Sequence, residues 1–127
     1  MASSPLSSVV SLDVCPPAGP YSPAIKAGGL VWVSGQLPID SNGVVVTESI
    51  CAMTAHSICN IKAILEAAGS ELGKVTRVGV FLSDMKYFAE MNAEYEKWFT
   101  HKPARTCVAV KQLPLGVDVE LDAVALQ

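Results

Sequence analysis

The sequence has little charge and no long apolar run. Only 17% of its 127 residues are charged while 50% are hydrophobic, which is a low charged fraction for a monomer in water. The apolar stretches are short and interrupted by glycine, serine or charged residues, so none approaches the ~20 residues that a membrane-spanning helix needs. We therefore expect no membrane partner, and we expect some apolar surface to close against other copies of the chain.

Basic residues are scarce and scattered. The chain has two arginines and seven lysines, its net charge is −3, and no run of Lys and Arg marks a phosphate-binding patch. Nucleic acid is therefore not an expected partner. No Arg or Lys precedes Lys26, which argues against a secretory signal and against an Arg-rich transit peptide. These absences predict a cytoplasmic protein.

The sequence lacks a credible metal-binding pattern. Four cysteines without CxxC spacing are expected to be free thiols: Cys15, Cys51, Cys59 and Cys107. His56 and Cys59 can share a helix face, but Cys51 lies two turns away, so we do not favour a zinc site. Cys107 as a nucleophile with His101 as its base is also disfavoured, because a cysteine in a strand more often fills the core. We predict neither a metal nor an organic cofactor.

The first half of the chain has the pattern of a buried strand followed by a helix. The segment GGLVWVSGQLPI is typical of a buried strand that ends in a loop, and a short returning strand is expected at 44–46. A helix is expected over 48–68, with Thr47 capping its start and Gly69 its end. The apolar residues of this helix form one stripe: Ile50, Met53, Ile58, Ile61, Leu65 and Ala68.

The second half predicts a strand, a helix and two more strands. A strand over 75–82 precedes a helix that is capped by Ser83 or Asp84 and runs to about Thr100. Its inward residues are expected to be Phe88, Met91, Tyr95 and Phe99. Strands over 104–111 and 117–125 follow. The last strand alternates apolar Val117, Val119, Leu121, Ala123 and Ala125 with acidic Asp118, Glu120 and Asp122.

This element order favours a single α+β domain over residues 1–127, with residues 1–8 as a flexible lead. Two helices packed on one sheet form a two-layer sandwich, and this arrangement leaves the second sheet face without a helical cover. The uncovered face is a second reason to expect an oligomer.

Arg105 is the most informative single residue. Alternation places Arg105, Cys107 and Ala109 on one face of the strand over 104–111, and the neighbouring positions on both faces are largely apolar. A cation held against such a surface needs an anionic partner. Either the protein or a ligand must supply that anion.

Three further residues have open interpretations. Asn92 borders the apolar stripe of the second helix, and satisfying a nearby backbone group is its simplest role. Tyr21 lies in the proline-rich loop GPYSPAI, where a packed side chain and a pocket wall are equally plausible. Glu120 is one of three acidic residues on a solvated strand face, or else the internal partner of Arg105.

Taken as a set, these segments resemble a known family. GPYSPAI, VSGQLPI, NIKAILEAAGS, VTRVGVFLSDM, NAEYEKWF, KPARTCVAVKQLP and VDVELDAVA are similar to the Rid family, the reactive intermediate deaminases also called the YjgF family. The resemblance extends from about residue 9 to the end of the chain. It implies a chorismate-mutase-like α+β fold and a homotrimer with three equivalent clefts between subunits.

The resemblance also implies an activity and a site. The activity is that of a 2-iminobutanoate/2-iminopropanoate deaminase, which hydrolyses enamines and imines such as 2-aminoacrylate to 2-keto acids and ammonia. Arg105 matches the residue that grips the substrate carboxylate, and Glu120 matches the residue that positions the attacking water. The other matching positions are expected to bind substrate: Tyr21, Ser34, Gly35, Asn92 and Cys107.

Two other functions compete with the deaminase. Some members of this family are described as endoribonucleases that inhibit translation. This chain is acidic and lacks basic residues interleaved with aromatic residues, which disfavours an RNA substrate. A module that only binds small carboxylates, or acts as a chaperone, is the other alternative, and the retained pair of Arg105 and Glu120 disfavours it.

Overall fold

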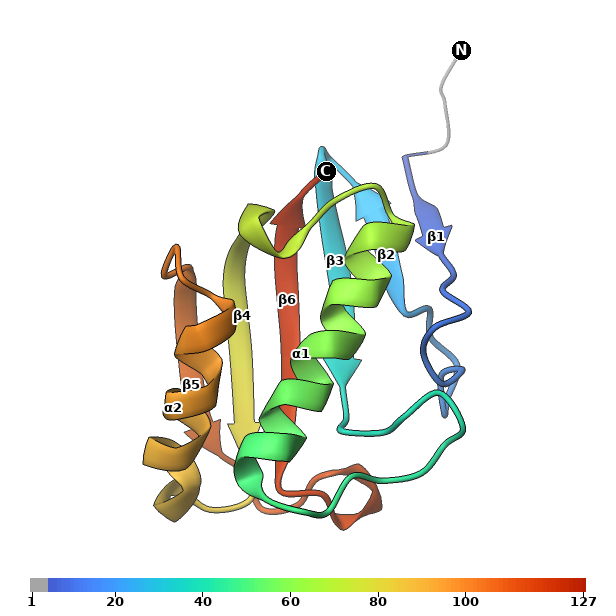
Figure 1. The fold of residues 1–127 in the computed structure, drawn as a ribbon. Coiled ribbons are helices and arrows are strands. Elements are labelled where there is room, and N and C mark those ends of the chain that lie inside the picture. The colour runs from blue at the N-terminus through green and yellow to red at the C-terminus, as the bar shows by residue number, and fades with distance from the viewer. Residues whose placement is uncertain (1–4) are drawn as a thin grey trace.

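The structure, a computed structural model, describes residues 5–127 and has two layers (Figure 1). One layer is a six-stranded sheet in the order β1-β2-β3-β6-β4-β5. Its strands are β1 Ser7–Val9, β2 Ala24–Ala27, β3 Leu30–Gln36, β4 Val75–Leu82, β5 Ala104–Ala109 and β6 Val119–Leu126. The helices α1 Ile50–Ala67 and α2 Phe88–Trp98 lie on the same face of this sheet. The predicted α+β two-layer fold is confirmed.

The strand pairing follows from the connections. All neighbouring strands are antiparallel except β4 and β5, which are parallel because α2 crosses between them. In this register Val78 of β4 is aligned with Arg105 of β5, and Phe81 of β4 is aligned with Glu120 of β6. These two alignments determine where the candidate site residues lie.

Helix α1 supplies much of the core. The six residues of its predicted stripe are all buried in the core, and the helix packs against both β6 and β3. The helix begins later than predicted, because the Ser49 side chain, and not that of Thr47, accepts a hydrogen bond from the N–H of Ala52 (2.9 Å). Gly69 follows the helix with φ of +82°, a left-handed conformation that glycine adopts without strain.

Helix α2 is shorter than the sequence pattern suggested. Asp84 caps a 3-10 turn at Met85–Tyr87, accepting a hydrogen bond from the N–H of Lys86 (2.8 Å), and α2 itself starts at Phe88. The inward positions of Met91, Tyr95 and Phe99 are confirmed. Phe88 was predicted inward and is instead 37% exposed, because the first residue of α2 lies beside Arg105 near the edge of the sheet.

The N-terminal region departs most from the prediction. Strands β1 and β2 were not predicted, and β1 includes Ser7 and Ser8 from the expected lead over 1–8, of which residues 1–4 lie outside the described part. The short strand expected at 44–46 is reduced to one bridge between Ile39 and Val45.

The sheet face opposite the helices carries exposed apolar side chains. Trp32 of β3 is 49% exposed and Val108 of β5 is 40% exposed. The neighbours of each residue along its strand point to the opposite face, which the helices cover. This bare face fits the expected oligomer, which stays a prediction. Within residues 5–127, neither helix is long and apolar enough to cross a membrane.

Candidate functional site

Arg105 is held by residues of α2. Its Nη1 donates a hydrogen bond to Oδ1 of Asn92 (2.7 Å). The guanidinium carbon lies 4.7 Å from the centroid of the Tyr95 ring and 5.7 Å from that of Phe88, so two aromatic rings also contact the cation. Cys107 lies two positions along on the same face of β5. We call Arg105, Asn92, Tyr95 and Cys107 the arginine half-site.

No carboxylate neutralises Arg105 within the described chain. The ion pairs there join Lys62 to Glu66 and Lys97 to Glu94, and neither involves Arg105. Asn92 occupies only one of the several N–H donors of a guanidinium, which leaves donors for a planar anion. The interpretation of Glu120 as the internal partner of Arg105 is therefore wrong within one chain.

Glu120 belongs to a second group of predicted residues. A side chain added at Gly35 would collide with the Glu120 carboxylate, so glycine at this irregularity of β3 lets the carboxylate lie against the backbone. The Ser34 hydroxyl donates to the carbonyl of Ser22 (2.7 Å), which ties β3 to the loop that carries the half-exposed Tyr21. We call Tyr21, Ser34, Gly35 and Glu120 the glutamate half-site.

Glu120 has the electrostatics of a base. Burial raises the pKa of its carboxyl group above the ordinary glutamate value, and the negative charge of Asp122 raises it further. Asp122 is fixed beside it, since its Oδ1 accepts a hydrogen bond from the N–H of Gly79 (2.9 Å). A carboxylate with a raised pKa accepts a proton more readily near neutral pH.

The sheet separates the two half-sites. Arg105 is aligned with Val78 and Glu120 with Phe81, and these two β4 residues are an odd number of positions apart, so their side chains point to opposite faces. The contact with α2 puts Arg105 on the helix-covered face, and Glu120 is therefore on the bare face. One chain does not bring the predicted catalytic residues together.

A cavity of about 150 Å³ adjoins the glutamate half-site. Tyr21 and Gly35 line it together with mainly apolar residues of the loops 14–18 and 36–43. Asn60 of α1 braces this wall, because its amide nitrogen donates to the carbonyls of Leu37 (3.1 Å) and Ile39 (3.0 Å). Asn60 was not among the predicted site residues, although an amide beside the apolar stripe of α1 is a recognisable signal for such a role.

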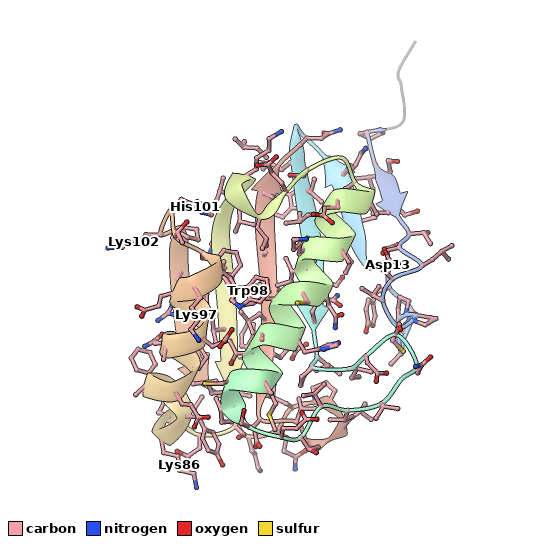
Figure 2. All side chains as sticks on the ribbon, in the orientation of Figure 1. Asp13, Lys86, Lys97, Trp98, His101 and Lys102 are labelled. Atoms are coloured by element: carbon pink, nitrogen blue, oxygen red, sulfur yellow. The ribbon has the colours of Figure 1, made fainter. Side chains whose placement is uncertain are left out.

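The cysteine and histidine alternatives gain no support from the geometry. In the described residues no three His, Cys, Asp or Glu side chains gather as metal ligands, and Cys51 instead contacts Glu90 of α2. His101 lies where β4 begins (Figure 2), with Nε2 2.8 Å from the carbonyl oxygen of Val75. Cys107 is aligned with Val80, roughly 16 Å further along the strand, so His101 does not act as its base.

Comparison with known proteins identifies the family. The model of the endoribonuclease L-PSP family matches residues 13–127. "Protein MMF1, mitochondrial" of Saccharomyces cerevisiae is 46% identical over 120 residues, covering 93% of this chain and 83% of the relative. The 2-iminobutanoate/2-iminopropanoate deaminase of Salmonella typhimurium is 39% identical over 127 residues, covering 96% of this chain and 99% of the relative.

A solved structure agrees with this result. The crystal structure of E. coli TdcF with bound serine has a TM-score of 0.90 and 30% identity, and the match covers 95% of this chain and 98% of that one. Sequence and fold thus agree over nearly the whole length. The predicted resemblance is confirmed, and the chain belongs to the Rid family, also called the YjgF family, which the endoribonuclease L-PSP model describes.

Proposed function

We propose that this protein hydrolyses 2-imino acids and their enamine tautomers, such as 2-aminoacrylate, to 2-keto acids and ammonia. One observation carries the proposal: Arg105 is fixed by an amide and two aromatic rings, while no carboxylate in the described chain neutralises it. A ligand carboxylate is the complementary group, because it pairs with the planar guanidinium through two charge-assisted hydrogen bonds. The deaminase relative and the serine bound by TdcF support a small carboxylate ligand.

The reaction needs only a positioned water and a proton acceptor. The enamine first tautomerises to the imine, whose protonated form has an electrophilic carbon. Glu120 accepts a proton from water as the water oxygen bonds to that carbon, giving a carbinolamine. The nitrogen then takes up a proton, the carbon–nitrogen bond breaks, and ammonia leaves as the hydroxyl becomes the keto group. The overall change consumes one imine and one water, and Arg105 holds the substrate carboxylate throughout.

The complete site requires two copies of the chain. The arginine half-site lies on the helix-covered side at the β5 edge, and the glutamate half-site lies on the bare face. We infer that the arginine half-site of one copy faces the glutamate half-site of the next in a homotrimer, which gives three equal clefts. The exposed apolar residues Trp32 and Val108 on the bare face support burial against another copy.

A coupled assay tests the activity. A serine or threonine dehydratase generates the imine in the cuvette, and keto acid formation is followed with and without this protein. We expect the protein to accelerate keto acid release beyond spontaneous hydrolysis, without added metal. No acceleration at micromolar protein, together with cleavage of an RNA substrate by the same preparation, would instead support the endoribonuclease alternative.

A mixing experiment tests the cleft between copies. The variants Arg105→Ala and Glu120→Gln are each expected to be inactive. Unfolding and refolding them together at equal concentration is expected to restore about a quarter of the wild-type activity. In randomly assembled trimers, an intact arginine half-site faces an intact glutamate half-site in about a quarter of the clefts. The matched control refolds each variant with itself. A mixture as inactive as its components, with mixed trimers shown by mass spectrometry, would mean that both half-sites of a cleft come from one copy.

The cytoplasmic location stays part of this proposal. Two yeast relatives carry the word mitochondrial in their names, so the mitochondrion is the compartment to compare. Fractionation of cells that express the full chain distinguishes the two compartments.

A further inference from the structure

The cavity beside the glutamate half-site has an apolar lining. Buried Val14 lines it, as do Pro16, Leu37 and Ile39, and in the described part of the chain no charged side chain does. The backbone of one wall is already satisfied, because the carbonyls of Leu37 and Ile39 accept hydrogen bonds from the Asn60 amide. This lining suits an apolar group. A charged group would lose its hydration there without gaining a partner.

The size of the cavity indicates how large that group is. Its volume is about 150 Å³. Apolar cavities of about this volume bind molecules as large as benzene. A branched side chain of four carbons or a phenyl ring therefore fits, whereas a methyl or ethyl group leaves most of the space unfilled. Unfilled space contributes nothing to binding, because dispersion attraction needs atoms in contact.

The cavity lies next to the reacting atoms of the proposed reaction. Tyr21 and Gly35 belong both to its lining and to the glutamate half-site, and the Glu120 carboxylate lies against Gly35. A 2-imino acid presents a carboxylate, an imine carbon and a side chain. The arginine half-site of the neighbouring copy binds the carboxylate, and Glu120 delivers water to the imine carbon. The side chain is the remaining group, and the cavity is the space beside it.

Leu115 lies at the rim of this cavity in an unusual conformation. It lines the cavity and is nevertheless 68% exposed, and its φ of +58° is in the left-handed region, which strains a leucine. It belongs to the 3-10 turn Pro114–Gly116 and precedes Glu120 by five positions. Neither core packing nor a preferred backbone conformation accounts for a leucine here. Contact with a bound apolar group would account for it.

We propose that the cavity binds the substrate side chain, that Leu115 covers this side chain, and that the protein therefore prefers 2-imino acids with branched or aromatic apolar side chains over 2-aminoacrylate. This inference rests on the proposed function and names the substrate class of its site. Leu115 is then a specificity-determining residue that takes no part in the chemical step. The smaller imino acids still react, because Arg105 and Glu120 contact groups that all members of the class share.

Keto acids with graded side chains test the cavity in the full-length wild type. Calorimetry measures the Kd of 2-oxobutanoate, 4-methyl-2-oxopentanoate and 2-oxoglutarate, which carry an ethyl, an isobutyl and a carboxyethyl group. We expect the Kd of 4-methyl-2-oxopentanoate to be about tenfold lower than that of 2-oxobutanoate, because two more carbons are buried. We expect the Kd of 2-oxoglutarate to be about tenfold higher, because its second charge finds no partner. Equal affinities would show that the side chain stays outside the cavity.

Substitutions at Leu115 test the rim. Asparagine is close to leucine in size and tolerates the left-handed conformation, so Leu115→Asn is expected to fold normally. We expect its Kd for 4-methyl-2-oxopentanoate to rise about fivefold, while that for 2-oxobutanoate stays within about twofold. Leu115→Met restores an apolar side chain and is expected to recover the preference. Leu12→Asn is the matched control, because Leu12 is 94% exposed and lies outside the lining of this cavity.

The ratio of the two Kd values separates a role in specificity from a structural one. Thermal unfolding and sedimentation verify that each variant folds and assembles like the wild type. A wild-type ratio in Leu115→Asn, or an equal loss of preference in Leu12→Asn, would overturn the inference. Wild-type protein that binds 2-oxobutanoate without preferring the larger acid overturns the inference alone. If the wild type binds no keto acid and does not accelerate imine hydrolysis, the proposed function fails and the inference fails with it.

Discussion

Arg105→Lys is expected to weaken 2-keto acid binding and imine turnover together, each by about tenfold or more. A lysine keeps the positive charge but loses the planar fork, so it cannot bond to Asn92 and to both oxygens of a carboxylate at once. Losing one charge-assisted hydrogen bond costs ~1.5–3 kcal/mol. Calorimetry with 2-oxobutanoate and the dehydratase-coupled assay measure the two effects.

The chain offers a matched control for this substitution. Arg77 is its only other arginine, and its Nη2 donates to Oγ1 of Thr106 (3.2 Å) on the bare face of the sheet. Arg77→Lys is expected to leave ligand affinity unchanged, and sedimentation verifies that both variants keep the wild-type assembly. Wild-type kinetics in Arg105→Lys would assign Arg105 a purely structural role with Asn92 and Tyr95.

Glu120→Gln is expected to lower turnover by a factor of about 10² to 10⁴, which is the usual effect of removing a general base. The Kd for 2-oxobutanoate is expected to change only a few-fold. Glutamine keeps the size and hydrogen-bonding capacity of the side chain but cannot accept the proton of water. Arg105 still holds the carboxylate. Severe loss of ligand binding in Glu120→Gln would mean that Glu120 orients the ligand and that another group activates the water.

The pH dependence of turnover tests independently whether Glu120 is the base. A base works only when deprotonated, so wild-type turnover is expected to fall as the pH drops through the pKa of Glu120, which lies above the ordinary glutamate value. Asp122→Asn removes the negative charge that contributes to this raised pKa and keeps an oxygen for the N–H of Gly79. We expect its acid limb to move to lower pH, whereas an unmoved limb would show that another group controls the profile.

Local patterns predicted most of the fold. The apolar stripe of α1 and the alternation of β6 each have one dominant period, and both emerged as the buried faces of the structure. Thr47 was predicted as the cap of this helix, whereas the Ser49 hydroxyl accepts the capping hydrogen bond from the N–H of Ala52. Strand β2 was not predicted, because it is short and follows a proline-rich loop.

The arrangement of the site could not be read from the sequence in the same way. Asn92 meets Arg105 only because α2 crosses back to make β5 parallel to β4, and a local pattern does not contain that long-range pairing. Both faces of β5 carry apolar residues, so alternation alone did not decide which face the helices cover. The separation of Arg105 from Glu120 therefore appeared only with the sheet register.

That separation has a genetic consequence. If every copy gives its arginine half-site to one neighbour and its glutamate half-site to the other, a single chain lacking both Arg105 and Glu120 disables two clefts of each trimer that it joins. Such a chain is harmful in proportion to how well it folds and assembles, since an unfolded version would be excluded from the trimer and would leave the normal copies intact. A doubly substituted gene would therefore act dominantly over a normal gene in the same cell.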